Sequence, residues 1–110
     1  MKHPKRKGSA GERELAAILT AHGFPARRND QFGIGGFDNP DVEAEGLEDF
    51  HFEVKRVERL NLEEAMQQAE ADAAGRVPVV VHRRNRRPWR VTLNLHDWLA
   101  AQKKPRQLGD

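Results

Sequence analysis

The segment from Pro40 to Arg56, PDVEAEGLEDFHFEVKR, restricts the fold more than any other part of this chain. In its two halves, even positions carry apolar residues: Val42, Ala44, Phe50, Phe52 and Val54. The odd positions carry polar and charged residues: Asp41, Glu43, His51, Glu53 and Lys55. Alternation with a period of two is typical of β-strands, and the glycine at position 46 favours a three-residue turn at 46–48. We therefore expect a β-hairpin with one apolar face and one charged face.

The apolar face also predicts the register of the hairpin. With this turn, Val42 faces Phe52, and Asp41 then faces Glu53 on the neighbouring strand. A slip by one residue would turn the apolar side chains away from the core, so this register is strongly favoured. Directly opposed β-carbons lie roughly 5 Å apart, and two partly buried carboxylates at that separation would each resist ionisation.

Two interpretations of the charged face are open: exposure to solvent, and a metal site. A divalent cation between Asp41 and Glu53 would remove their repulsion, and oxygen ligands without sulfur favour Mg2+ or Mn2+ over zinc. Lys55 would emerge on the same face about 6.5 Å further along, where it would position an attacking water or contact a phosphate. The five histidines show no short ligand spacing, which disfavours a zinc enzyme.

The rest of the chain predicts an α/β domain in the order α-β-β-β-α-β-β-α. Ser9 is expected to cap the first helix, with Glu12 at the capping-box position and Gly23 at the end. Asn61 is expected to cap the second helix, which ends at Gly75. The other expected elements are strand 24–28, loop 29–39, strand 77–82, turn 85–88, strand 89–94 and helix 96–101. We expect a flexible basic arm at 1–8, a single domain at 9–102 and a flexible basic tail at 103–110.

Charge is segregated along the 110-residue chain, although the net charge is only +2. Between Asp30 and Asp72 there are 13 acidic residues and 3 basic ones. Basic residues cluster near the start, around position 85 and in the tail. A basic frame around an acidic centre favours a metal-dependent enzyme that acts on a phosphate backbone, the alternative being ordinary solvated surface. The absence of cysteine excludes disulfides and thiolate metal sites.

Two helical residues extend the candidate site. Glu12 lies within the apolar stripe of the first helix, whereas Glu14 flanks it. The carboxylate of Glu12 either accepts from the Ser9 amide or serves as a third acidic group at the metal. Gln68 borders the apolar stripe of the second helix, whereas Gln67 points away. The side-chain amide of Gln68 either satisfies a buried hydrogen bond or faces the site.

The segments GERELAAIL, GFPARR, NPDVEA, FHFEVKR and EEAMQQAEADA, in this order, resemble the PD-(D/E)xK nuclease superfamily. The likeness is greatest to archaeal-type Holliday junction resolvases and their phage or bacterial relatives, and it extends from about Lys7 to Leu95. It implies a restriction-endonuclease-like core, in which helices flank a mixed central sheet. The glycine-rich loop 29–39 departs from the serine-bearing segment of many resolvases, which weakens the expectation of junction specificity.

The resemblance also implies roles for individual residues. Asp41 matches the first acid of the motif, Glu53 matches the second acid, and Lys55 matches the lysine. Glu12 matches the acid of the first helix, and Gln68 matches a glutamine that lies beside the site. The implied cofactor is Mg2+, with Mn2+ as a substitute, held by Asp41, Glu53, Glu12 and the carbonyl of Val54. Contacts to DNA are expected from the basic residues Lys5, Arg6, Lys7, Arg27, Arg28, Arg83, Arg84, Arg86 and Arg87.

The expected function is a Mg2+-dependent DNA endonuclease that selects four-way junctions and acts as a homodimer, each subunit cutting one strand to leave a 5′-phosphate. No nucleotide cofactor and no membrane partner are expected. The apolar stretches are too short to span a bilayer and no secretory signal is recognisable, so we expect a soluble cytoplasmic protein. One alternative is a related nuclease acting on flaps, mismatches or duplex DNA. Another is a non-catalytic nucleic-acid-binding module.

Overall fold

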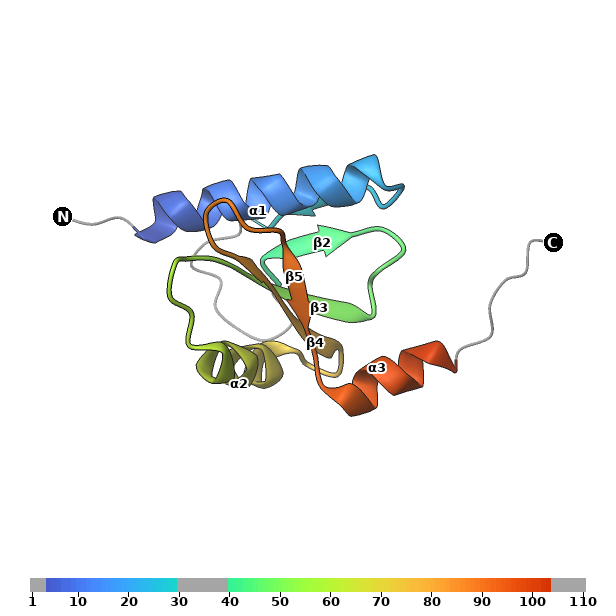
Figure 1. Ribbon diagram of the computed structural model, residues 1–110. Coiled ribbons are helices and arrows are strands. Elements are labelled where there is room, and N and C mark those ends of the chain that lie inside the picture. The colour runs from blue at the N-terminus through green and yellow to red at the C-terminus, as the bar shows by residue number, and fades with distance from the viewer. Residues whose placement is uncertain (1–3, 30–39, 104–110) are drawn as a thin grey trace.

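The structure, a computed structural model, describes residues 4–29 and 40–103, of which residues 4–9 are described as backbone only (Figure 1). The element order α-β-β-β-α-β-β-α expected from the sequence is confirmed. In chain order the elements are α1 (Pro4–Ala21), β1 (Ala26–Arg28), β2 (Val42–Ala44), β3 (Phe50–Arg56), α2 (Leu62–Asp72), β4 (Val77–Arg83), β5 (Arg90–Thr92) and α3 (Leu95–Gln102).

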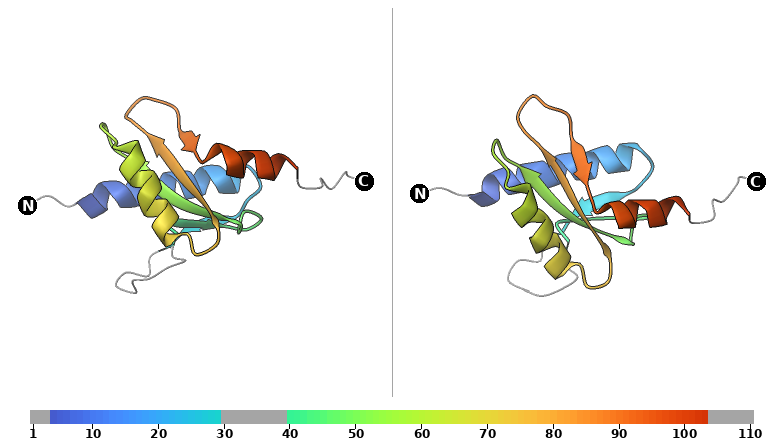
Figure 2. Two further views of the ribbon diagram at one scale, coloured as in Figure 1. Left: turned by 90° about the horizontal axis from the view of Figure 1, so that it is seen from below. Right: turned by 60° about the horizontal axis from the view of Figure 1, so that its bottom comes forward.

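The five strands form one mixed sheet in the order β1-β2-β3-β4-β5. Strands β1, β2 and β3 are antiparallel neighbours, β3 and β4 are parallel, and β5 returns antiparallel to β4. A parallel pair needs a long crossover connection, and α2 provides it. Helices α1 and α2 lie on opposite faces of the sheet (Figures 1 and 2). The expected α/β class with a mixed central sheet is therefore confirmed.

The hairpin forms in the expected register. Val42 pairs with Phe52, and the amide of Asp41 donates to the carbonyl of Phe52 over 3.0 Å. Gly46 has a φ of +92°, the left-handed conformation that glycine adopts without strain at a turn. Asp41 thus precedes β2 directly and stands beside Glu53 in the middle of β3.

The sheet is buried on both faces, which decides the meaning of the charged face. On the α1 face, the core consists of Leu15, Ala16, Val42, Phe52, Val54, Val79 and Val81. On the α2 face, Ala65, Met66 and Ala69 pack against Val80. Glu53 pairs with Val80 across β3 and β4, and parallel partners share a face of the sheet. Solvent exposure is therefore the wrong interpretation for His51 and Glu53, which are 0% and 6% exposed.

The first helix begins earlier than the sequence predicts. Because α1 runs from Pro4, Ser9 lies inside the helix and is not its N-cap. Within this helix, Gly11 lies at a tight contact, where an added β-carbon would lie 3.0 Å from the β-carbon of Arg56. A glycine at this contact lets α1 pack closely against β3. The helix also includes residues 4–8 of the expected arm.

The remaining boundaries differ by a few residues. The first strand starts at Ala26 rather than Phe24 and is an edge strand, as Pro25 predicts. Asn61 caps α2 as expected, its side chain accepting from the Glu64 amide over 3.0 Å. Residues 30–39 of the expected loop and 104–110 of the expected tail lie outside the described residues. In the ranges 4–29 and 40–103, no helix has the length and apolar character needed to cross a bilayer.

Candidate active site

The hairpin brings three residues of the expected motif together. Asp41 stands directly before β2, where its Oδ2 accepts from the amide of Val54 over 2.9 Å. Glu53 is buried in β3, and its Oε2 lies 3.6 Å from Nζ of Lys55. The strand alternation places Glu53 and Lys55 on the same face, and the hairpin register places Asp41 beside them. Two carboxylates and one ammonium group therefore share one partly buried edge.

The electrostatic environment at this edge disfavours the ionised form of Asp41. Burial and the neighbouring Glu53 carboxylate raise the pKa of Asp41 from 3.8 to about 7. The carboxylate of Glu12 raises this pKa further, while the Val54 amide and Lys55 act in the opposite direction. Additional positive charge at this edge would therefore stabilise the ionised form of Asp41. A divalent cation would supply that charge, and the carboxylate and carbonyl oxygens available are donors that Mg2+ and Mn2+ accept.

Glu12 and Glu14 have different partners. Oε1 of Glu12 accepts from Nε of Arg28 over 2.9 Å, so α1 is tied to β1 beside the acidic edge. Because Ser9 lies inside α1, the capping bond to its amide, one of the two roles considered for Glu12, does not apply. Glu14 instead accepts from Arg83 over 3.1 Å and lies 3.6 Å from Nε of Arg56. Only Glu12 of the two contributes to the raised pKa of Asp41, and its role as a metal ligand stays a prediction.

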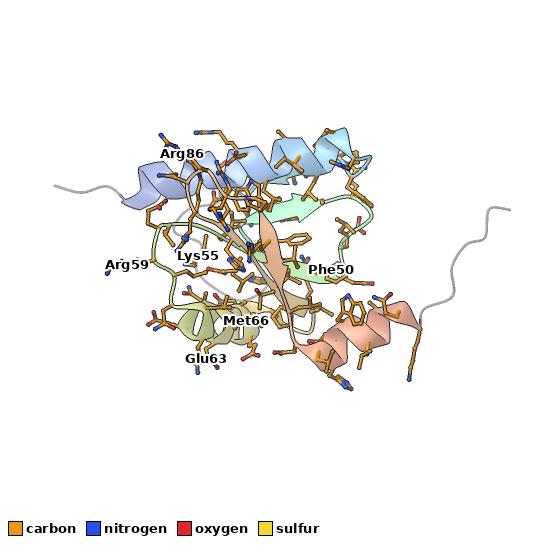
Figure 3. All side chains as sticks on the ribbon, viewed as in Figure 1. Phe50, Lys55, Arg59, Glu63, Met66 and Arg86 are labelled. Carbon is orange, nitrogen blue, oxygen red and sulfur yellow. The ribbon has the colours of Figure 1, made fainter. Side chains whose placement is uncertain are left out.

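Helix α2 leaves both of its glutamines in solvent. Gln67 and Gln68 are each exposed, so the expectation of a buried Gln68 amide is wrong. The physical reason is the narrow buried stripe of the helix, which consists of Ala65, Met66 and Ala69. Figure 3 shows Met66 between α2 and the sheet, with Glu63 on the outer side of the helix. A role for Gln68 beside the site stays a prediction.

A cluster that could hold a metal ion lies next to the hairpin residues. His51, Glu53 and Asp72 each offer a donor atom, and these atoms lie within 4.8 Å of one another. Two of the three residues come from β3 and the third ends α2. Sequence reasoning placed His51 on the same strand face as Glu53 but missed Asp72. The only local sequence signal for this cluster is that His51 and Glu53 lie two positions apart on one strand. Asp72 is distant in sequence and is brought beside them by the crossover.

The expected DNA contacts divide into paired and exposed arginines. Arg28 and Arg83 are engaged with Glu12 and Glu14. The turn between β4 and β5 exposes three arginines, and β1 exposes a fourth: Arg84, Arg86, Arg87 and Arg27. Residues lining a hollow beside the turn include Arg59, Arg83, Arg84, Arg87 and Arg90. The side chains of Lys5, Arg6 and Lys7 lie outside the described part of the structure.

Comparison with known proteins gives an informative likeness among solved structures. No protein-family model and no curated protein matches the sequence. Among solved structures, Hjc from Archaeoglobus fulgidus, a Holliday junction resolvase from an archaeal hyperthermophile, aligns with a TM-score of 0.55 at 27% sequence identity. The alignment covers 76% of this chain and 74% of that one.

The chain is similar to an archaeal Holliday junction resolvase. The likeness confirms the restriction-endonuclease-like fold, in which helices flank a five-stranded mixed sheet. It also supports the resemblance to the nuclease superfamily and a nuclease or resolvase role.

Proposed function

We propose that this protein is a metal-dependent endodeoxyribonuclease that cuts branched DNA, with the four-way junction as its preferred substrate. The observation that carries the proposal is the acidic edge at Asp41, Glu53 and Lys55. Burial and the Glu53 carboxylate raise the pKa of Asp41, so a cation would stabilise the ionised pair, and the fold around these residues is similar to that of a resolvase. A binding module would have no need for such a site.

The donor set fits Mg2+, with Mn2+ as a substitute. Asp41, Glu53 and the carbonyl of Val54 would hold the ion, and Glu12 would complete the set. When bound, the ion supplies positive charge that polarises the scissile phosphate and favours deprotonation of the attacking water. Lys55 orients that water and offsets the negative charge that develops in the transition state. The Nζ atom of Lys55 lies 3.6 Å from Oε2 of Glu53, so the ammonium group is already beside a residue that would hold the ion.

Basic residues outside this edge would hold the DNA. Arg84, Arg86 and Arg87 are exposed on one turn, and Arg27 is exposed on the strand next to Asp41. Contacts of this kind go to phosphates and carry no sequence information, so binding should fall steeply with salt. The resemblance to resolvases supports a homodimer in which each subunit cuts one strand of the junction and leaves a 5′-phosphate.

Cleavage of a four-way junction, compared with a flap and a linear duplex of the same sequence, tests the proposal. We expect junction cleavage with Mg2+ or Mn2+, none with EDTA, and none by Asp41→Asn. Glu43→Gln, which removes one carboxylate from the same strand, serves as the matched control and should cut at a similar rate. Undiminished cleavage after exhaustive chelation would refute the metal mechanism. Equal rates on all substrates would leave a nuclease without junction preference, and no cleavage of any DNA would leave a binding module.

A further inference from the structure

His51 is buried without the partners that an imidazole needs. The residue is 0% exposed in the middle of the sheet. Among the described residues, neither Nδ1 nor Nε2 of its ring has a hydrogen-bond partner. A buried polar group without a partner is costly, and native proteins seldom keep one unless a bound species or a function satisfies it.

The surroundings of His51 are negative. Nε2 lies 3.8 Å from Oε1 of Glu53, too far for a hydrogen bond and close enough for both atoms to bind one ion. Asp72 is the last residue of α2, where the partial negative charge of the helix end disfavours a carboxylate. The last turn of α2 carries no basic residue that would compensate. Lys55 approaches the other oxygen of Glu53, Oε2, at 3.6 Å.

We propose that His51, Glu53 and Asp72 form a second metal site, adjacent to the hairpin site, that takes a transition-metal ion such as Mn2+, Co2+ or Zn2+. An imidazole with two carboxylates suits these ions, whereas Mg2+ prefers oxygen donors alone. Donors about 2.1 Å from such an ion lie roughly 3.4 Å apart at a tetrahedral angle. The three donor atoms already lie within 4.8 Å of one another, so small side-chain rotations close the site.

Glu53 connects the two sites through its two oxygens. Oε1 is directed toward His51, and Oε2 toward Lys55 at the acidic edge. The second ion therefore holds the Glu53 carboxylate in place for the hairpin site. His51 and Asp72 belong to the second site alone, so its occupancy can be measured whether or not the protein cleaves DNA.

Binding of Co2+ to the full-length protein, followed by calorimetry and by visible absorption, tests the second site. We expect wild-type protein and Asp41→Asn to bind Co2+. The visible absorption spectrum of the bound Co2+ should indicate a nitrogen ligand. His51→Gln and Asp72→Asn should bind it at least about tenfold more weakly and lose that spectrum. Glu63→Gln, which removes an exposed carboxylate from the same helix, is the matched control and should bind like wild type.

A second measurement needs no variant in the cluster. In 15N-labelled wild-type protein, Zn2+ should shift the ring resonances of His51 at the first equivalent. Unmoved His51 resonances at saturating Zn2+ would overturn the second site. Equal Co2+ affinity in wild type, His51→Gln and Asp72→Asn would do the same, as would loss of all Co2+ binding in Asp41→Asn. Ligation by His51 in a protein that cuts no DNA would support the second site and refute the proposed function alone.

Discussion

Replacement of Asp41 by asparagine should stabilise the metal-free protein at alkaline pH while it abolishes cleavage. In the folded protein, burial and Glu53 raise the pKa of Asp41 from 3.8 to about 7. At about 1.4 kcal/mol for each pKa unit, ionised Asp41 costs up to about 4 kcal/mol of folding free energy. Asparagine removes the charge, and its amide oxygen can still accept from the Val54 amide. For a domain of this size we expect a rise in melting temperature on the order of 10 °C.

The effect should depend on pH in a defined direction. Because the pKa of Asp41 is higher in the folded state than in the unfolded state, its contribution to stability is fully present below pH about 4 and is lost as the pH rises through about 7. The asparagine variant has no such dependence. The difference in melting temperature between variant and wild type should therefore be near zero at pH 4 and largest at pH 8.

Thermal unfolding in EDTA, followed by circular dichroism from pH 4 to pH 8, measures this difference. Glu43→Gln removes a carboxylate from the same strand and should show a small difference that varies little with pH. Addition of Mg2+ at pH 8 should stabilise wild type and leave Asp41→Asn unchanged. An asparagine variant that is less stable than wild type at pH 8, or a difference that does not change with pH, would refute the electrostatic reasoning.

Three further predictions concern single residues of the site. Glu12→Gln should lower the single-turnover cleavage rate more than Glu14→Gln, and equal rates would remove Glu12 from the site. The main effect of Glu14→Gln should be a lower melting temperature, because this change releases two arginines. Lys55→Ala should bind the junction as wild type does in a mobility-shift assay, and its cleavage rate should fall by about 100-fold or more. Loss of binding by the folded variant would assign the lysine to recognition. Gln68→Ala should slow cleavage about tenfold, while Gln67→Ala should be nearly neutral, because both amides are exposed but only Gln68 borders the stripe of α2 that faces the sheet. The same rate for both at saturating Mg2+ would contradict this role.

Short stretches of sequence determined the hairpin, its register and the start of α2. In the hairpin, alternation and a glycine turn act over neighbouring residues, and the pairing of Val42 with Phe52 follows from them. In α2, the Asn61 side chain accepts from an amide three residues away, a contact that needs no other part of the chain. Each of these interactions is local, so the residue pattern is enough to predict it. Asp41 and Glu53 were therefore correctly placed side by side from the sequence.

Only the tertiary structure decided the environment of those residues. Alternation cannot distinguish a charged face in solvent from one covered by a helix, and α2 covers His51 and Glu53 here. Asp72 joins them because the crossover returns the chain to the same face of the sheet. Likewise, Glu12 selects Arg28 as its partner across 16 positions of the chain. Burial and long-range pairing depend on how distant elements pack against one another. The periodicity of residues within a single element does not predict this packing.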